Sequence, residues 1–215
     1  DILHIAQHFH QLSIRKFKLT RGEPTLRKDF VEIVTGLNEL SNNHGGVDSS
    51  IGMTTNGVAL NESKLRSLRD AGLTSLNVSL DTLDPHKFAQ ITRRPSSYLD
   101  RVLRTIESAS TIIDNVKINC VVQRDVNDSD VADLVQLTNR YNNIKVRFIE
   151  YMPFADNGWQ YDQCVPYQEL LERLYKDGVH LEFVESLDPH DTTKWYATTT
   201  NDNTPNVGFI TSMSS

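Results

Sequence analysis

Short runs of β-branched and apolar residues alternate along this chain with segments whose apolar residues recur at helical spacing. The runs occupy residues 16–20, 51–54, 76–80, 116–122 and 144–150. Their starts lie about 25 to 40 residues apart, and a helical pattern fills each gap. Strands in this order imply right-handed βαβ units and a parallel sheet. Five such units predict a barrel or partial barrel, with a flat doubly wound sheet as the rival architecture.

The last part of the chain departs from this pattern. Residues 181–184, 195–198 and 207–211 are short β-forming runs joined by polar loops, and we expect short antiparallel strands there. Helices are expected at residues 1–11, after Asp29, and at 61–71, 85–90, 98–110, 129–140 and 167–176.

The composition is that of an ordinary globular protein. The 215 residues fit one domain with a sizeable core, or a domain with a short appendage. The net charge of −6 argues against broad nucleic-acid binding but leaves room for a local basic pocket for a phosphate. No apolar run approaches membrane-spanning length. The two cysteines, Cys120 and Cys164, are too few for a metal site of their own and suit a reducing intracellular compartment.

Small hydroxyl residues, glycines and acids follow the predicted strands. In parallel α/β architectures, catalytic and binding groups gather at the carboxyl ends of the strands. Those ends read Thr20-Arg-Gly-Glu23, Thr54-Thr-Asn-Gly57, Ser79-Leu-Asp81, Gln123-Arg-Asp125 and Glu150-Tyr-Met152. A purely structural barrel would carry turn residues at the same places, so location alone leaves a pocket and a set of turns equally open. Residues 54–57, taken alone, are better explained as a capped turn.

Three cations lie within the predicted strands. Lys18 is in the middle of the first, Lys117 begins the fourth, and Arg147 lies between Val146 and Phe148 in the fifth. A cation in a central strand faces the barrel interior or the helix layer, and its burial without a counter-charge would be expensive. Three of them in an acidic protein favour an anionic ligand such as a phosphate chain.

Other polar residues have simpler explanations. His4 and His8 have the spacing of a metal pair on one helix face, but no acid lies between them, and we favour a solvated face. Cys120, inside a strand, is interpreted as a small core residue rather than a nucleophile. Cys164 has no partner in the sequence nearby, and residues 188–191 are interpreted as a polar turn.

The first predicted strand ends abruptly at Gly22-Glu23-Pro24, although packing alone requires neither an acid nor a proline there. The stretch Lys16-Phe-Lys-Leu-Thr-Arg-Gly-Glu-Pro-Thr-Leu-Arg27 resembles the Gly-Gly-Glu-Pro motif of radical S-adenosylmethionine enzymes. Further segments make the chain resemble one family, the GTP 3′,8-cyclases of molybdenum cofactor biosynthesis. These segments are Thr54-Thr-Asn-Gly57, Ala71-Gly-Leu73, Asn77-Val-Ser-Leu-Asp81, Val116-Lys-Ile-Asn119, Val126-Asn-Asp128, Val146-Arg-Phe-Ile-Glu-Tyr-Met-Pro153 and Gly208-Phe-Ile-Thr-Ser-Met-Ser214. Each motif is weak alone, but the ordered set is specific.

This resemblance implies a partial (β/α)6 TIM-like barrel at residues 1–155, followed at 156–215 by the last barrel helix and the start of a C-terminal extension. Members of the family bind one [4Fe–4S] cluster on a Cys-x3-Cys-x2-Cys loop and a second cluster in the extension. The first cluster reductively cleaves S-adenosylmethionine, and the 5′-deoxyadenosyl radical takes a hydrogen atom from ribose C3′ of GTP. C3′ then attacks guanine C8, which gives (8S)-3′,8-cyclo-7,8-dihydroguanosine 5′-triphosphate, on the route to cyclic pyranopterin monophosphate.

The resemblance also implies which residues bind the two small molecules. The positions that match contacts to S-adenosylmethionine are Gly22, Glu23, Ser79 and Met152. The positions that match contacts to GTP are Lys18, Thr54, Lys117 and Arg147. The expected chemistry is a rigid acidic turn for the amino acid end of the cofactor and cations for the triphosphate.

The chain also departs from the family pattern. Arg21 stands where the motif has its first glycine and adds bulk beside the expected methionine site. Asp125 replaces a turn glycine, which aspartate tolerates, and Lys18 keeps the charge of an arginine without its fork. Neither cysteine set of the family occurs in these residues, so this chain by itself is not expected to be active. A non-catalytic nucleotide-binding remnant and a radical enzyme with another substrate remain alternatives.

The expected partners follow from the same resemblance. They are GTP and a reductant for the cluster, with a homodimer as a further expectation, and neither nucleic acid nor a membrane. The expected location is intracellular: the mitochondrial matrix in a eukaryote, or the cytoplasm in a bacterium.

Overall fold

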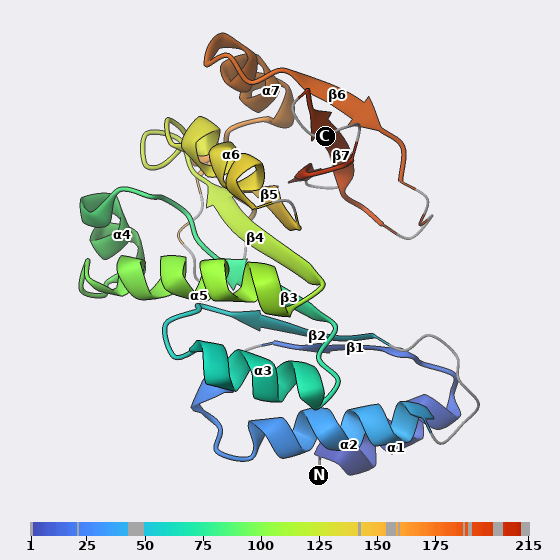
Figure 1. Ribbon diagram of the computed structural model, residues 1–215. Coiled ribbons are helices and arrows are strands. Elements are labelled where there is room, and N and C mark those ends of the chain that lie inside the picture. Colours follow the sequence, from blue (N-terminus) through green and yellow to red (C-terminus); the bar gives the residue numbers. More distant parts are fainter. Residues whose placement is uncertain are drawn as a thin grey trace. The chain divides into compact units, whose positions relative to one another are not determined.

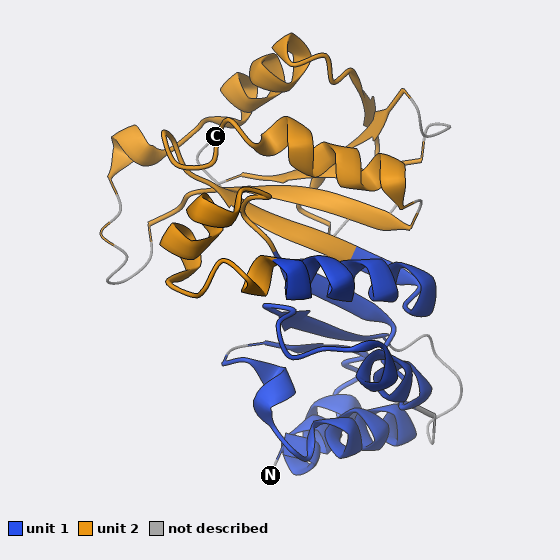
Figure 2. Ribbon diagram, turned by 60° about the vertical axis from the view of Figure 1, so that its left-hand side comes forward, with its two compact units in different colours: residues 1–79, 100–116 blue, residues 80–99, 117–215 orange. Residues whose placement is uncertain are grey.

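A computed structural model describes residues 2–20, 22–42, 50–141, 143–153, 158, 160–186, 188, 191–199 and 204–211. The chain divides into two compact units, which Figure 2 shows in different colours. Unit 1 comprises residues 1–79 and 100–116, and unit 2 comprises residues 80–99 and 117–215. Within the described part, no helix is long and apolar enough to cross a membrane.

Unit 1 is built on three parallel strands in the order β1-β2-β3. These strands are β1 (Lys16–Leu19), β2 (Ser50–Thr55) and β3 (Ser75–Ser79). Its helices are α1 (Ile2–Gln11), α2 (Phe30–Asn42), α3 (Glu62–Asp70) and most of α5 (Tyr98–Ile112), and a short 3-10 helix, η1, spans Pro24–Leu26. Helices α1, α2 and α3 lie on the same side of β1 and β2 (Figure 1).

The strand register in unit 1 separates an apolar face from a polar one. Because side chains alternate along a strand and paired residues of parallel strands share a face, the register sorts every residue. The apolar set includes Ile51, Met53 and Leu76, each at most 1% exposed. The other face carries only polar residues and a glycine: Lys16, Lys18, Ser50, Gly52, Thr54, Ser75, Asn77 and Ser79. We call this set the polar face of unit 1.

Unit 2 holds the remaining strands, in the order β4-β5-β8-β7-β6. They are β4 (Asn115–Val122), whose first two residues belong to unit 1, β5 (Ile144–Glu150), β6 (Leu181–Val184), β7 (Lys194–Thr198) and β8 (Val207–Ile210). Its helices are α4 (Pro85–Thr92), α6 (Val131–Arg140), α7 (Tyr167–Lys176) and the short η2 (Tyr161–Gln163). The rings of Phe148 and Phe209, whose centroids are 5.7 Å apart, join β5 to β8 in the core.

The predicted elements are confirmed to within a few residues, with one revision in the tail. Strand β6 pairs with β7 and β7 with β8 in antiparallel fashion, as expected. However, β8 also pairs with β5 in parallel, which the local pattern did not indicate. The tail strands thus extend the sheet of unit 2 through β8.

Candidate functional site

The turn after β1 is tied to the end of β2 by one carboxylate. Oε1 of Glu23 accepts hydrogen bonds from the Thr25 and Thr55 hydroxyls, both at 2.6 Å, and from the Thr25 backbone N–H at 3.3 Å. Oε2 accepts from the backbone N–H of Asn56 at 2.8 Å. Four donors from two strand ends therefore converge on this half-buried side chain, and they fix the turn relative to β2.

Gly22 immediately precedes this tied carboxylate. Its φ of +55° lies in the left-handed region, and a Cβ built on it would meet no atom within 4 Å. Glycine adopts this conformation without strain, and it leaves the backbone of the turn open to a close neighbour. The arrangement presents an exposed, rigidly held backbone, which is the kind of surface that binds the amino acid end of a small molecule. Arg21, the predicted departure from the motif, lies outside the described residues.

The polar face of unit 1 holds three further predicted site residues, Lys18, Thr54 and Ser79. Thr54 is half-buried, and its hydroxyl accepts a hydrogen bond at 3.3 Å from the side-chain amide of Asn77, its register partner on β3. Ser79 is exposed at the carboxyl end of β3. Between Lys18 and Ser75, Gly52 leaves no room for a side chain, since an added Cβ would lie 2.7 Å from the Ser75 hydroxyl.

The burial expected for Lys18 is wrong. Strand β1 pairs only with β2 among the described strands, so it lies at the edge of unit 1 rather than in a central position. Lys18 is exposed as a result, and its charge requires no anionic partner to offset burial. Any role for Lys18 in ligand binding must therefore rest on its place on the polar face.

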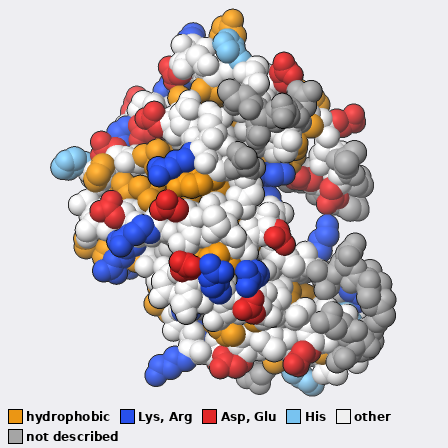
Figure 3. Space-filling model, in the orientation of Figure 1, with side chains coloured by type: hydrophobic (Ala, Val, Ile, Leu, Met, Phe, Trp, Pro, Cys, Tyr) orange, Lys and Arg blue, Asp and Glu red, His pale blue; other side chains and the backbone are white. Residues whose placement is uncertain are grey.

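In unit 2, the two predicted cations Lys117 and Arg147 lie on neighbouring strands. Lys117 is half-buried on β4, on the same face as Asn119 two residues later. The Nε–H of Arg147, on β5, donates to the Asn119 side-chain oxygen at 3.0 Å. On the molecular face drawn in Figure 3, acidic and basic side chains are interspersed rather than gathered by sign. Lys117 and Arg147 therefore share one face of the sheet of unit 2.

Burial and a nearby acid shift the pKa of Arg147 in opposite directions. Burial lowers its pKa, and the negative charge of Asp191 raises it in part. Asp191 is itself held by the Trp195 indole N–H at 2.6 Å and the Thr193 backbone N–H at 2.9 Å. Burial raises the pKa of this carboxyl, but those hydrogen bonds together with Arg147 bring it below its ordinary value. Lys145, on the same face of β5, lies over the Trp195 ring at 5.1 Å.

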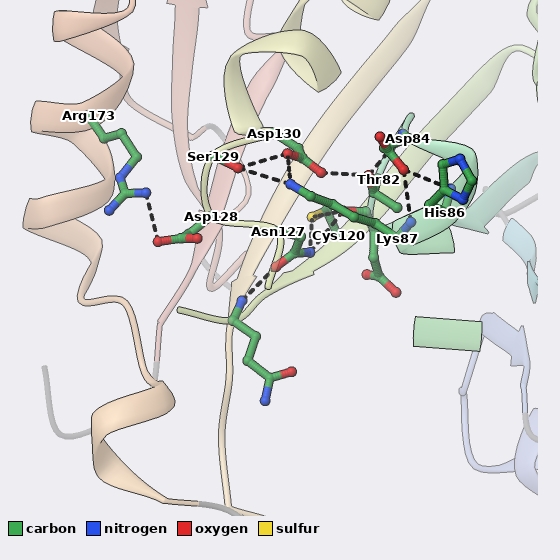
Figure 4. A network of polar contacts seen from close by, with 12 residues as sticks. Thr82, Asp84, His86, Lys87, Cys120, Asn127, Asp128, Ser129, Asp130 and Arg173 are labelled. Atoms are coloured by element: carbon green, nitrogen blue, oxygen red, sulfur yellow. Dashed lines mark hydrogen bonds and ion pairs between the residues drawn. The ribbon is translucent and has the colours of Figure 1, made fainter. Parts of the chain in front are cut away.

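A buried amide organises the turn after β4 (Figure 4). The side-chain N–H groups of Asn127 donate to the backbone oxygens of Asp81 at 2.8 Å and Val121 at 2.9 Å. Its side-chain oxygen accepts from the Gln123 backbone N–H at 2.8 Å. The Asp81 carboxylate accepts from the Val121 backbone N–H at 2.8 Å, and burial raises its pKa. Asp81 is therefore held to β4 through both its backbone oxygen and its carboxylate.

Two ion pairs extend this network to the helices of unit 2. Lys87 reaches from α4 to the Asp130 carboxylate, which also accepts from the Thr82 hydroxyl. Arg173 reaches from α7 to Asp128 at 2.7 Å, as Figure 4 shows. Asp125, which precedes them in the turn, has a φ of +58°, so it does occupy the left-handed conformation expected of a glycine position. We interpret these contacts as scaffolding.

The remaining predicted residues have separate outcomes. Met152 follows β5 and is half-buried. The carboxylate of Glu150, at the end of β5, accepts from the Tyr167 backbone N–H at 3.0 Å, so it holds the start of α7. His4 and His8 are exposed, as expected of a solvated helix face, and their ring nitrogens lie 3.2 Å apart. Asp191 donates its backbone N–H to the Asp188 oxygen at 3.0 Å, as a turn requires, although residues 189 and 190 lie outside the described part.

The cysteines do not fit an iron–sulfur cluster. Cys120 is fully buried, and burial raises the pKa of its thiol well above the ordinary value, which confirms its interpretation as a core residue. Burial also raises the pKa of the Cys164 thiol. Cluster ligation requires several thiolates together, and the described residues contain no group of three potential metal ligands.

Sequence reasoning missed three side chains that hold the candidate site. Asn77, Asn119 and Asp191 contact or influence predicted site residues, yet none was given a role. Alternation along the strands contained a signal for two of them. Asn77 shares the strand face of Ser79, and Asn119 shares that of Lys117, so an amide on the same face as a predicted contact was readable from the spacing.

Comparison with known proteins adds two results. The model of the radical SAM superfamily matches residues 1–138. The mitochondrial GTP 3′,8-cyclase of Arabidopsis thaliana is 40% identical over 99% of this chain, and the GTP 3′,8-cyclase of Staphylococcus carnosus is 38% identical over 98%. The chain spans 52% and 59% of the length of these two curated relatives.

Solved structures agree on the fold. Streptococcus suis SuiB bound to S-adenosylmethionine matches 98% of this chain with a TM-score of 0.64, at 15% identity, and this chain matches 43% of that structure. The open, mostly parallel strand arrangement and this likeness confirm the predicted α/β fold class, a partial TIM-like barrel.

Proposed function

This chain belongs to the radical SAM superfamily, and on that premise we propose that the protein is a GTP 3′,8-cyclase of molybdenum cofactor biosynthesis. The proposal is carried by relatives of that name in a plant and a bacterium, which align with almost all of this chain at about 40% identity. The cyclase would convert GTP to (8S)-3′,8-cyclo-7,8-dihydroguanosine 5′-triphosphate.

The residues of unit 1 fit S-adenosylmethionine. When bound and reductively cleaved, this cofactor supplies the 5′-deoxyadenosyl radical that takes a hydrogen atom from the ribose of GTP. The open backbone at Gly22 would receive the methionyl end, and the exposed Ser79 hydroxyl would donate or accept a hydrogen bond. Met152, in unit 2, is the fourth predicted contact.

We assign Glu23 a positioning role rather than a direct contact through its side chain. Both of its carboxylate oxygens accept hydrogen bonds from Thr25, Thr55 and Asn56. Glu23 would therefore act by holding the Gly22 turn at the end of β2. Pro24 supports the same role because it fixes φ directly after the acid.

The proposed GTP contacts are Lys18 and Thr54 in unit 1 and Lys117 and Arg147 in unit 2. Lysine and arginine suit phosphate oxygens, and the planar fork of Arg147 favours a bidentate contact. The Asn77 amide already donates to the Thr54 hydroxyl oxygen, so the hydroxyl proton of Thr54 is directed elsewhere and can be donated to a ligand.

The family uses an iron–sulfur cluster with S-adenosylmethionine, and we propose that this protein carries two [4Fe–4S] clusters. The described cysteines do not supply the ligands, and none of the steps above is assigned to a cluster. We further propose a separate reductant, a homodimer, and an intracellular location that is mitochondrial in a eukaryote. The division into a barrel at residues 1–155 and an extension at 156–215 is proposed on the same basis.

Product analysis tests this proposal. The full-length protein, reconstituted with iron and sulfide under anaerobic conditions, would be reduced with dithionite and incubated with S-adenosylmethionine and GTP. We expect 5′-deoxyadenosine and a cyclised guanosine triphosphate in equal amounts, and neither the cyclised product nor comparable 5′-deoxyadenosine with ATP. If a sample with full cluster content releases no 5′-deoxyadenosine with GTP, the proposed activity is wrong. Release with ATP but not with GTP would indicate a radical enzyme with another substrate.

A further inference from the structure

We propose that Lys64 is a positioning residue for the turn at residues 22–27: it holds this turn from α3, so that the open backbone at Gly22 stays in place for the methionyl end of S-adenosylmethionine. The inference rests on the proposed function, because it concerns how one proposed cofactor contact is kept in place. Its basis is the 2.6 Å hydrogen bond that Lys64 Nζ donates to the backbone oxygen of Thr25. All of these residues belong to unit 1.

The oxygen that Lys64 holds is the one that the turn itself leaves without a donor. The two preceding carbonyls, those of Glu23 and Pro24, each accept a backbone N–H from within the turn at 3.1 Å. Thr25 is buried, and among the described residues it is Lys64 that donates to its backbone oxygen. A buried carbonyl without a donor is costly, and a charged donor makes a stronger hydrogen bond than a neutral one. The bond therefore restrains the turn.

Lys64 is itself fixed at its backbone. Its N–H donates at 2.9 Å to the side-chain oxygen of Asn61, which caps the start of α3. Leu65, the next residue of the helix, is fully buried, so this part of α3 is packed into the core of unit 1. The lysine side chain thus runs from a fixed helix start to the turn, and it can transmit the position of the helix to Thr25.

The segment that leads into α3 holds the same turn at a second point. This segment, residues 56–61, begins with Asn56, whose backbone N–H donates to Glu23 Oε2 at 2.8 Å. The buried hydroxyl of Thr105, on α5, lies within hydrogen-bond distance of two backbone oxygens of the segment, at 2.7 and 3.1 Å. An anchored connection between β2 and α3 therefore holds η1 at its N-cap through Glu23 and within the helix through Lys64.

Two attachment points restrict a turn more than one does. With the Glu23 carboxylate as the single tie, η1 can pivot about it, and Gly22, which adjoins Glu23, moves as well. The bond from Lys64 to Thr25 removes this rotation because it lies on the far side of Pro24. A backbone that is already in place spares the ligand the cost of ordering it. Lys64 would thus contribute to cofactor affinity without touching the cofactor.

Binding measurements on the full-length, cluster-reconstituted protein test the proposal. Lys64→Met keeps the apolar stem without the donor, and Lys28→Met is the matched control, because Lys28 is an exposed lysine beside the same turn. Anaerobic calorimetry gives the dissociation constants for S-adenosylmethionine and for GTP. We expect Lys64→Met to bind S-adenosylmethionine about tenfold more weakly and GTP within about twofold of the wild type. Lys28→Met should bind both ligands as the wild type does.

A conservative variant separates the hydrogen bond from the bulk of the side chain. Lys64→Arg keeps a charged donor on a long stem, and it should bind S-adenosylmethionine within about threefold of the wild type. An affinity as low as that of Lys64→Met would show that the charged donor is not what acts, and the inference would be wrong.

The outcomes separate the positioning role from the proposed function. If Gly22→Ala weakens S-adenosylmethionine binding and Lys64→Met does not, Gly22 is a cofactor contact that Lys64 does not position. If Lys64→Met weakens both ligands equally, Lys64 supports the fold as a whole, and the inference is again wrong. If the wild type does not bind S-adenosylmethionine, or Gly22→Ala binds it unchanged, the proposed cofactor contact fails and the positioning role fails with it. Thermal midpoints check folding, and Lys64→Gln, with a shorter and uncharged donor, replaces Lys64→Met if that variant is unfolded.

Discussion

The two units of this protein hold their candidate site residues by different means. In unit 1 a single carboxylate, Glu23, gathers four donors, and the group it positions is an uncharged backbone at Gly22. In unit 2 an uncharged amide, Asn119, accepts a hydrogen bond from a charged side chain, Arg147. A charged side chain thus holds a backbone turn in unit 1, and a neutral amide contacts a cation in unit 2.

The predicted cations of the two units also differ in burial. Lys18 on the edge strand β1 is exposed, whereas Arg147 on the inner strand β5 is buried enough for its pKa to fall. An exposed lysine adapts to a ligand by rotating, while a half-buried arginine is restricted by its surroundings. We therefore expect substitutions around Glu23 to affect stability most, and substitutions around Arg147 to affect ligand affinity most.

Removal of the Glu23 carboxylate should have the largest effect on stability. Glu23→Ala leaves the Thr25 and Thr55 hydroxyls and the Asn56 N–H without their acceptor, and we expect a loss of about 3 kcal/mol in the free energy of unfolding. Urea denaturation measures it. Glu62→Ala, whose partner Arg66 is also exposed, is the control and should cost at most about 0.5 kcal/mol. Equal losses in the two variants would contradict the tie assigned to Glu23.

Removal of the Asn127 amide should have a large effect on the stability of unit 2. Asn127→Leu leaves the Asp81 and Val121 carbonyls and the Gln123 N–H without their hydrogen-bond partner in a buried site. We expect a loss of about 2–3 kcal/mol in the free energy of unfolding. The same denaturation experiment measures it, with Asn139→Leu, at an exposed position of α6, as the control. A loss as small as that of the control would show that water replaces these bonds.

Gly208 tests whether the stem of Arg147 is confined. Gly208→Ala introduces contacts under 3.2 Å with Thr193, Trp195 and Arg147, and we expect a loss of about 1–3 kcal/mol together with weaker GTP binding. Gly178→Ala meets no atom within 4 Å but has a φ of +80°, so it should cost about 1 kcal/mol through the backbone and leave GTP binding unchanged. Unchanged GTP binding in Gly208→Ala would show that this packing does not affect the proposed GTP contact of Arg147.

Two acids of unit 2 should give pH effects of opposite sign. Burial raises the pKa of Asp81, so its charged form destabilises the fold and stability falls as pH rises through the raised pKa. Asp81→Asn keeps an acceptor for the Val121 N–H, and it should be more stable than the wild type at pH 7 but not at pH 3. Each kcal/mol would appear as a shift of about 2–4 °C in the thermal midpoint.

Asp130 provides the contrast. Burial raises its pKa, but hydrogen bonds from Lys87, Thr82 and Ser129 outweigh it, so the pKa lies below the ordinary value. Its contribution is present above the unfolded-state pKa of about 3.9 and is lost as pH falls through the lowered value. Asp130→Asn should therefore be less stable than the wild type at pH 7, with the difference shrinking toward pH 3. The same pH trend in both variants would contradict the two assignments.

The sequence predicted local features better than long-range ones. Alternation in β2 to β5 and helical spacing in α5 to α7 placed most elements, because both signals arise from near neighbours. The exposure of Lys18 depended on which strand lies at an edge, and the parallel pairing of β8 with β5 joins residues about 60 positions apart. Asn119 and Arg147 are 28 residues apart, so no local pattern could reveal their bond. The family resemblance predicted candidate contacts, and the structure shows which side chains bond to them, such as Asn77 to Thr54 and Asn119 to Arg147.

We propose that Gly22 in unit 1 contacts S-adenosylmethionine and that Arg147 in unit 2 contacts GTP. The most direct test is anaerobic calorimetry of both ligands with the full-length wild type, Gly22→Ala and Arg147→Ala. We predict a crossed result: Gly22→Ala weakens S-adenosylmethionine binding about tenfold or more and leaves GTP binding within twofold, while Arg147→Ala does the reverse. Loss of both ligands in either folded variant, or loss of neither ligand in both variants, would contradict the division of roles.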